Sequence, residues 1–231
     1  MSANPQTSNV RFFRKKSPLP APPPSKQLIP IEREGKREFL SVQEFEKTTG
    51  ATFIPQLDFE DFSLFANIAK KNEKLQKQGK LPREQLWLGS YFRKEILTFP
   101  LPDIVLRYVN SAVGWGVFAA RDFQKMEFIA EYSGKLRRRK RLFDQKNAYC
   151  FEYLLAPGTA TRYTIDARDQ GGIGRWINHS FTPNLLSTLA TVDFISHIIL
   201  VTQQPIAKGT QLCYDYGPDY WSHRTSPKDL K

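Results

Sequence analysis

Two short segments in the C-terminal half of the chain combine residue types that can build a binding site. Residues 178–180, Asn-His-Ser, bring amide, imidazole and hydroxyl groups into one turn, and the Thr-Pro-Asn at 182–184 fixes its exit. Residues 214–217, Tyr-Asp-Tyr-Gly, are expected to present two phenols on opposite sides of an extended chain, one at each end of a channel. Taken singly, each segment is equally compatible with a structural turn or with core packing.

His179 follows an apolar Trp-Ile pair and Asn178 in the sequence, and such a histidine is more often a satisfied structural residue than a catalyst. We therefore expect its backbone to matter more than its ring. Asn178-His179-Ser180 is also a formal acceptor for N-glycosylation. The polar segment 1–9 offers no hydrophobic secretory core, so the glycosylation interpretation has little force.

Gly114-Trp115-Gly116 resembles the start of a dinucleotide-binding fingerprint, which requires a helix of about ten or more residues directly afterwards. Residues 121–125 instead predict a turn that leads into another strand, so we reject that reading. Glycines that flank an aromatic residue still let the backbone approach a ligand closely. A tight hairpin is the alternative.

The net charge of +11 is concentrated in particular segments. Residues 100–231 carry 17 Lys and Arg against 12 Asp and Glu, and six of these basic residues lie within 135–141. The remainder of this half is close to neutral. The run 135–141 predicts a contact with nucleic acid, anionic lipid or an import receptor, with a solvated helix face as the alternative.

The chain divides into four parts by composition. Residues 1–30 hold seven prolines and no acidic residue, which predicts a disordered or polyproline arm: a secretion signal, a ligand for a proline-reading domain, or a plain tail. Residues 31–102 predict a helical flanking region, with helices at 58–79 and 82–97. The second helix should place Trp87 and Tyr91 in the core. Residues 222–231 form a basic tail.

Short apolar runs separated by turns dominate residues 103–221 and predict strands at 117–120, 128–132, 149–154, 162–166 and 195–202. Many short strands with few helices favour small sheets wound around one another. Two cysteines and three histidines without paired spacing predict no disulfide framework and no metal site. Such cysteine usage favours a reducing compartment, and no apolar run approaches the ~20 residues of a membrane span.

Five motifs follow one another in an order that resembles the SET domain of protein lysine methyltransferases over residues 103–221. They are Gly114-Trp115-Gly116, Glu131-Tyr132-Ser133-Gly134, Ile165-Asp166-Ala167, Arg175-Trp176-Ile177-Asn178-His179-Ser180 and Tyr214-Asp215-Tyr216-Gly217. The small size and the absence of cysteine-rich flanks are similar to the bacterial, chlamydial-type members. The resemblance implies a mainly β fold with helices, in which small sheets surround a C-terminal pseudoknot.

The resemblance also implies a function: transfer of a methyl group from S-adenosyl-L-methionine to a lysine of a histone or histone-like protein. Tyr216 and Tyr132 would be catalytic, and Tyr132, Tyr214 and Tyr216 would form the lysine channel. A tyrosine at 214 implies mono- or at most dimethylation, because its hydroxyl takes the room of a further methyl. The implied cofactor-binding residues are Gly114, Trp115, Gly116, Tyr149, Arg175, Asn178, His179, Tyr216 and Trp221.

Several positions depart from the family pattern without removing a residue assigned to chemistry. Lys135 and Gln211 each stand where glutamate is usual, and Met126 stands where a turn glycine is common. Tyr220 and Trp221 would close the C-terminal side in place of a zinc cluster, either by stacking on adenine or as a hydrophobic plug.

Two alternatives to a methyltransferase stay open: a catalytically weak SET-fold module that binds chromatin or nucleic acid, and a basic nucleic-acid-binding protein. A bacterial cytoplasmic location, or secretion into a host cell and entry into its nucleus, fits the resemblance.

Overall fold

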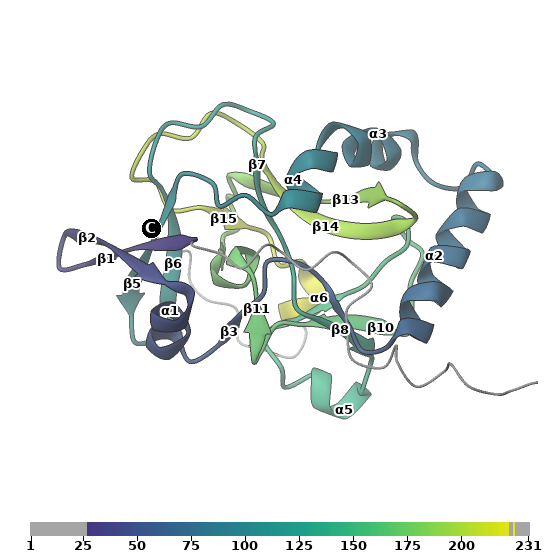
Figure 1. Ribbon diagram of the computed structural model, residues 1–231, viewed down its shortest axis with the longest axis horizontal. Coiled ribbons are helices and arrows are strands. Elements are labelled where there is room, and N and C mark those ends of the chain that lie inside the picture. Colours follow the sequence, from purple (N-terminus) through teal and green to yellow (C-terminus); the bar gives the residue numbers. More distant parts are fainter. Residues whose placement is uncertain (1–26, 222–223, 225–231) are drawn as a thin grey trace, which may run out of the picture.

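The computed structural model describes residues 27–221 and Arg224, without the side chains of Arg141, Leu142 and Asp219. The predictions for the Pro-rich arm and for the basic tail therefore fall almost wholly outside the described residues. Inside them, three sheets of three or four strands and two strand pairs surround the C-terminal segment (Figure 1). Within the described part of the chain, no helix has both the length and the apolar character needed to cross a membrane.

The first sheet has the order β2-β1-β5-β6 and carries the Gly-Trp-Gly motif on its last strand. Its strands are β1 (Leu28–Arg33), β2 (Lys36–Ser41), β5 (Ile104–Asn110) and β6 (Gly114–Ala119). Ile29 and Ile31 lie on the same face of β1 and are fully buried, and Pro30 between them is buried as well. Thus the N-terminal hairpin extends the sheet that presents the motif.

Helix α1 (Val42–Thr49) is fixed at both ends by its sequence. Ser41 and Glu44 form a reciprocal capping box, and Gly50 takes the left-handed conformation at the C-terminus. The buried face of the helix inserts Phe45 edge-on against Trp176, with ring centroids 5.8 Å apart. The N-terminal flank therefore packs directly on the segment that contains the Asn-His-Ser turn.

The second sheet has the order β4-β8-β10-β9, and the third β13-β14-β7. Their strands are β4 (Asp58–Phe59), β8 (Lys135–Arg138), β10 (Tyr163–Asp166), β9 (Cys150–Glu152), β13 (Leu185–Val192), β14 (Ile195–Thr202) and β7 (Phe128–Glu131). Helices α2 (Phe62–Lys77), α3 (Arg83–Tyr91) and α4 (Arg93–Thr98) lie along one side of the molecule, with α3 against β13 (Figure 1). Every residue of β14 is buried.

The remaining elements are short and belong to the site. They are the pair β3 (Thr52–Phe53) and β11 (Gln170–Gly171), the pair β12 (Asn178–His179) and β15 (Cys213–Tyr214), the 3₁₀ turn η1 (Ile173–Trp176), and helices α5 (Arg141–Asp144) and α6 (Pro218–Trp221). The predicted mainly β architecture is confirmed. So is the rejection of the dinucleotide-binding reading, because β6 leads by a turn to β7 and not into a helix.

The flank differs from its prediction as a helical region. Residues 28–41 form the β1–β2 hairpin, because Glu34 and Gly35 adopt the left-handed conformation of a tight turn. The predicted helix 82–97 is two helices that meet at Phe92, whose side chain is buried. Trp87 and Tyr91 are about half exposed and stack on each other, so placing them in the core was wrong.

The contact between α3 and β13 depends on Gly89. A Cβ built there would lie 1.9 Å from the carbonyl oxygen of Thr191, a separation that neither backbone can relieve without shifting. We expect Gly89→Ala to lower the free energy of unfolding by about 2 kcal/mol or more, measured by urea denaturation. Ser90→Ala, an exposed change on the same helix, should stay within about 0.5 kcal/mol of wild type. Equal stability of the two variants would contradict this packing.

Candidate active site

The two segments singled out in the sequence lie side by side. β12 and β15 pair in parallel, with Asn178 opposite Cys213 and His179 opposite Tyr214. The backbone N–H of Ser180 continues the ladder by donating to the carbonyl of Tyr214 at 3.2 Å. We call this crossing of 175–184 with 211–217 the knot.

Asn184 holds the second segment of the knot with its amide. Its Nδ2 donates to the carbonyl of Gln211 at 2.8 Å, and its Oδ1 accepts from the backbone N–H of Cys213 at 2.9 Å. Its own N–H donates to the carbonyl of Cys213 at 3.2 Å. One side chain thus supplies a donor and an acceptor to a strand that has no neighbour on that side, which is what an amide can do and a carboxylate cannot.

The ring of His179 positions the phenol segment. Its Nδ1 accepts the backbone N–H of Tyr216 at 3.2 Å, so in the neutral ring the proton lies on Nε2. The ring is buried and packs edge-on against Phe181 and Trp221, at 4.3 and 4.8 Å between centroids. The imidazole is therefore structural, as expected, yet it contributes more than its backbone alone because it orients Tyr216.

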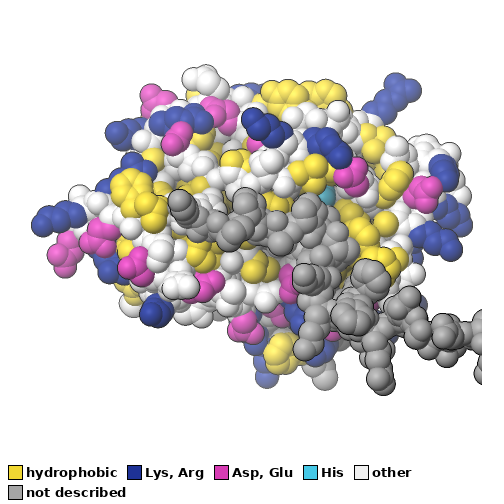
Figure 2. All heavy atoms as spheres, in the orientation of Figure 1, with side chains coloured by type: hydrophobic (Ala, Val, Ile, Leu, Met, Phe, Trp, Pro, Cys, Tyr) yellow, Lys and Arg dark blue, Asp and Glu magenta, His cyan; other side chains and the backbone are white. Residues whose placement is uncertain are grey.

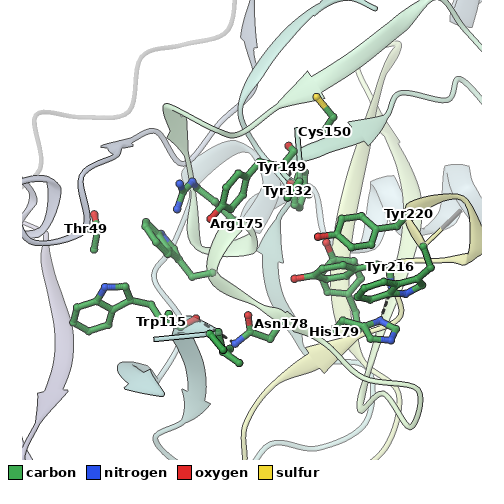
Figure 3. A pocket seen from close by; sticks show the side chains of 17 residues that line it. Thr49, Trp115, Tyr132, Tyr149, Cys150, Arg175, Asn178, His179, Tyr216 and Tyr220 are labelled. Atoms are coloured by element: carbon green, nitrogen blue, oxygen red, sulfur yellow. Dashed lines mark hydrogen bonds between the residues drawn. The ribbon is translucent and has the colours of Figure 1, made fainter. Parts of the chain in front are cut away.

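A cavity of about 460 Å³ opens beside the knot and collects nearly all the predicted site residues. Figure 3 shows the hydroxyls of Tyr216 and Tyr220 pointing into it, with Arg175 and Trp115 on the other side. The predicted residues on its wall are Gly114, Trp115, Tyr132, Tyr149, Arg175, Asn178, His179, Tyr214, Tyr216 and Trp221.

Gly116 is the one predicted residue that is not on the cavity wall. A Cβ at this position would lie 2.7 Å from Nε2 of Gln211 and 3.1 Å from Nδ2 of Asn178. Asn178 Nδ2 in turn donates to the carbonyl of Trp115 at 3.2 Å. The glycine is needed because β6 and the knot touch here, and this contact sets the position of Trp115 in the cavity.

Other residues of the wall carried no recognisable signal in the sequence. They come from three places: the end of α1, the β5–β6 turn, and the segment that leads into β9 together with the first residue of that strand. They are Thr49, Ala112, Val113, Ala148 and Cys150. Trp176 lies on the wall too; it belongs to the predicted motif 175–180 but had no assigned role. Tyr220 also lies there, and it was expected to help close the C-terminal side of the site.

Two phenols, the buried Tyr132 and the half-buried Tyr216, are anchored by hydrogen bonds to backbone carbonyls. Tyr132 Oη donates to Tyr149 O and Tyr216 Oη donates to Ile177 O, each at 2.9 Å. The Tyr214 ring lies 4.8 Å from that of Tyr216, on the same side of the chain. The prediction of opposite sides was wrong, because residues two apart in an extended segment share a face.

Burial raises the pKa of Tyr132, Tyr214 and Tyr216 well above the ordinary value for a phenol. The cause is desolvation, which penalises the phenolate, with further increases from the neighbouring phenols. These residues are therefore neutral at physiological pH. They can donate and accept hydrogen bonds, but they cannot serve as phenolate bases.

Arg175 is the main charged group of the cavity. Burial lowers its pKa, and its guanidinium lies over the rings of Tyr149 and Trp176 at 4.2 and 4.0 Å. Nε and Nη2 donate to the carbonyls of Ala167 and Arg168, at 2.6 and 2.9 Å. Nη1 is buried without a hydrogen-bond partner among the described residues. A fixed cation with one unused donor is suited to a negatively charged or acceptor-rich ligand.

A second hollow, of about 790 Å³, lies on the other side of the phenols, and we call it the outer groove. Cys150, Tyr216 and Tyr220 belong to the walls of both the outer groove and the cavity. β9 forms one side of the groove, and the segment 216–220 forms the other. The aromatic rings are thus the partition between two hollows.

The basic run 135–141 does not form one surface patch. It begins as β8, in which Arg137 is buried and shared between Asp144 and Asp166, at 2.6 and 2.8 Å. Arg139 pairs with Glu152 at 2.9 Å. On the face seen in Figure 2, Lys and Arg side chains are scattered among acidic ones. The sequence could not show this, because strand burial depends on which sheet the run joins.

Arg137 ties α5 and the segment before β9 to the sheet, and this segment carries Tyr149. Replacing Arg137 by alanine should lower the free energy of unfolding by about 3 kcal/mol, because two carboxylates lose their shared cation. Arg139→Ala breaks only a partly exposed pair and should cost less than about 1 kcal/mol. Urea denaturation measures both, and a similar loss in both would refute the assignment.

The same network predicts a pH effect. Burial acts to raise the pKa of Asp166, but hydrogen bonds from Arg137 and Asn147 outweigh it and the pKa is lowered. Such a carboxyl adds stability above its unfolded pKa of about 3.9, and this is lost as pH falls through the folded pKa. The stability gap between wild type and Arg137→Ala should therefore narrow below about pH 4. A gap that stays constant from neutral to acid pH would contradict the assignment.

The chain is similar to a known family and to several known proteins. Residues 114–217 match the family model for the SET domain. N-lysine methyltransferase KMT5A-A of Xenopus laevis is 41% identical over 116 residues, which cover 45% of this chain and 33% of that protein. Histone-lysine N-methyltransferase Su(var)3-9 of Drosophila melanogaster is 32% identical over 127 residues, which cover 50% of this chain and 20% of that protein.

A crystal structure of Arabidopsis thaliana SUVH6 in complex with SAM covers 49% of this chain and 27% of its own, with a TM-score of 0.43 and 29% identity. The match thus spans about a third or less of the length of these relatives. The order of the five motifs and the family match agree, since both mark residues 114–217 of this chain as similar to the SET domain.

Proposed function

We propose that this protein is an S-adenosyl-L-methionine-dependent protein-lysine N-methyltransferase. The observation that carries the proposal is the partition between the cavity and the outer groove. Tyr216 and Tyr220 line both hollows, so a lysine side chain in the groove can reach a group in the cavity past a wall of phenols. The animal relatives are N-lysine and histone-lysine methyltransferases, which supports the same activity.

The residues of the cavity fit the cofactor. Its volume of about 460 Å³ lies in the range of small-molecule sites. Three buried donors have no hydrogen-bond partner among the described residues: Arg175 Nη1, Trp176 Nε1 and Trp221 Nε1. S-adenosyl-L-methionine offers a carboxylate and purine nitrogens as acceptors, and when bound it supplies an electrophilic methyl group on a sulfonium.

Different residues of the cavity would hold different parts of the cofactor. The backbone of Gly114 and Trp115 would hold the amino-acid end, with Tyr149 and Arg175 beside it. Asn178 and His179 would contact the cofactor partly through their main chain. Trp221, packed against His179, would cover the adenine side. Gly116 would act indirectly, by letting β6 approach the knot.

The phenols prepare the lysine amine. Only a neutral amine can attack, and its unperturbed pKa is about 10.4. Burial among Tyr132, Tyr214 and Tyr216 lowers that pKa because the charged form is desolvated. Since these phenols are neutral, the amine's proton passes to solvent and not to a phenolate. The ring wall then excludes water and orients the nitrogen lone pair, and alignment of this kind supplies roughly 7–11 kcal/mol in well-oriented systems.

The substrate backbone would be added to the free edge of β9. This strand is the last of its sheet. The carbonyl of Tyr149 and the N–H of Tyr153 are hydrogen-bonded to residues 167 and 163, so the backbone groups of Cys150 and Glu152 face away from β10. The N–H of Cys150 donates to the carbonyl of Asn147 at 3.4 Å, so Glu152 and the carbonyl of Cys150 are the groups offered to a peptide. An extended peptide could pair there, with its lysine directed at the phenols.

We further propose that the substrate is a histone or histone-like protein and that the product is mono- or dimethylated lysine. The hydroxyl of Tyr214 has no hydrogen-bond partner among the described residues and lies on the cavity wall, where it would occupy space beside the amine. We propose no separate nucleic-acid or nuclear-import function for 135–141. Arg137 is buried in an ion network and Arg139 is paired.

Exchanging single phenols tests the proposal. Tyr216→Phe should lower the rate of transfer to protein lysine by about 10- to 100-fold, because one oriented hydroxyl is lost. Tyr214→Phe should instead raise the number of methyl groups added. Labelled S-adenosyl-L-methionine with a histone panel and cell lysate gives the rates, and mass spectrometry gives the products. Thermal unfolding with cofactor shows whether both variants still bind it.

Inactivity of the wild-type protein on every substrate, together with no thermal shift by the cofactor, would refute the function. Wild-type activity that persists fully in Tyr216→Phe would refute the role of this residue.

The rate should also depend on pH in one direction. Turnover must increase as pH rises from about 7 to 9, because more of the amine is neutral. The raised pKa of Tyr132 and Tyr216 predicts no loss from phenolate formation over that range. A pH profile of kcat/KM on one peptide measures this, and a fall between these pH values in folded enzyme would contradict it.

A further inference from the structure

The outer groove is unusually rich in arginine for a surface expected to receive a basic histone tail. Among the residues whose side chains are described, its walls carry four arginines and two carboxylates: Arg138, Arg139, Arg162, Arg224, Asp144 and Glu152. The excess of cations lies next to Tyr216 and Tyr220, at the mouth of the proposed lysine channel. A bound peptide feels mainly these nearby charges of the groove, because more distant charges of the chain are screened by salt.

Both carboxylates of the groove are already engaged. Asp144 accepts from Arg137 at 2.6 Å, with only 9% of its side chain exposed. Glu152 pairs with Arg139 at 2.9 Å. Neither has a free charge with which to attract basic residues of a substrate.

Three of the cations, in contrast, have no carboxylate within ion-pair distance among the described residues: Arg138, Arg162 and Arg224. Arg162 is exposed next to β10. Arg224 is held in place by stacking on Tyr220 at 4.3 Å and by donating to the carbonyls of Tyr220 and Gln145, each at 2.9 Å. The backbone N–H of Arg138, and not its guanidinium, donates to Glu60 Oε2 at 3.4 Å.

We propose that the outer groove selects a lysine flanked by acidic residues, so that within the proposed histone or histone-like substrates the methylated lysine lies in an acidic or mixed-charge segment and not in a basic run. The inference rests on the proposed function. A strand added to β9 would place alternate side chains toward the groove, within reach of the unpaired guanidinium groups. Lysine-rich flanks would meet like charges there, which suppresses binding of the wrong partner.

Three peptides with the same central lysine test the selection on the full chain. Their flanks carry Asp and Glu, Asn and Gln, or Lys and Arg, and transfer from labelled S-adenosyl-L-methionine gives kcat/KM for each. We expect the acidic peptide to exceed the basic one by about tenfold at low salt, with the neutral peptide between them. The ratio should shrink in about 0.5 M NaCl, because exposed charges are then screened.

Charge reversal locates the effect. Arg162→Glu, and the double change with Arg138→Glu, should abolish or invert the preference for the acidic peptide. Lys80→Glu makes the same change of net charge in the exposed connection between α2 and α3, outside the groove, and should keep the wild-type ratio. Thermal unfolding with and without cofactor verifies that all variants remain folded and bind it.

The outcomes separate the two proposals. Equal methylation of the three peptides, a preference for the basic one, or an unchanged ratio in folded Arg162→Glu overturns the groove selection while leaving the methyltransferase standing. Failure to methylate any peptide or protein, with no thermal shift by S-adenosyl-L-methionine, overturns both.

Discussion

The parallel pairing of 178–179 with 213–214 is the constraint on which the site depends. Parallel strands need a crossover between them, and here the crossover is the β13–β14 hairpin and the segment that follows it. The crossing brings His179 under Tyr216 and lets the Asn184 amide hold the backbone on both sides of Leu212. Without this crossing, the phenols and the other residues of the cavity wall would not lie around one cavity.

The knot is short, so the surrounding layers must hold it. Phe45 from α1 packs on Trp176, and β6 presses against Asn178 where Gly116 leaves no side chain. The N-terminal flank is therefore part of the site's support, and Thr49 at the end of α1 even reaches the cavity. Residues outside the family match thereby influence the position of residues within it.

The sequence predicted the elements with strong local signals: β14, the capped helix α2 and the turn that excludes a dinucleotide fold. It also predicted which residues share the cavity, because the motif order resembled a known domain. It failed where long-range pairing decides the outcome. Lys135–Arg138 reads as an exposed basic run, yet sheet pairing buries Arg137 between two carboxylates. Trp87 and Tyr91 read as core, yet the buried face of α3 is formed by Gln85, Leu88 and Gly89, and the two aromatic side chains are exposed.

The fate of the basic run shows why net charge is a poor guide to a partner. Burial assigns one cation to an internal network, and pairing cancels another on the surface, so the charge that a ligand meets depends on which guanidinium groups remain unpaired. In this chain Arg138, Arg162 and Arg224 are such groups at the outer groove and Arg175 is one in the cavity, while the phenols between them are neutral. A lysine side chain that reaches the phenols moves from the arginine-rich outer groove to an aromatic wall that is shielded from water. The groove repels the charged ammonium, and the wall further disfavours it, so both favour the neutral amine that the reaction requires.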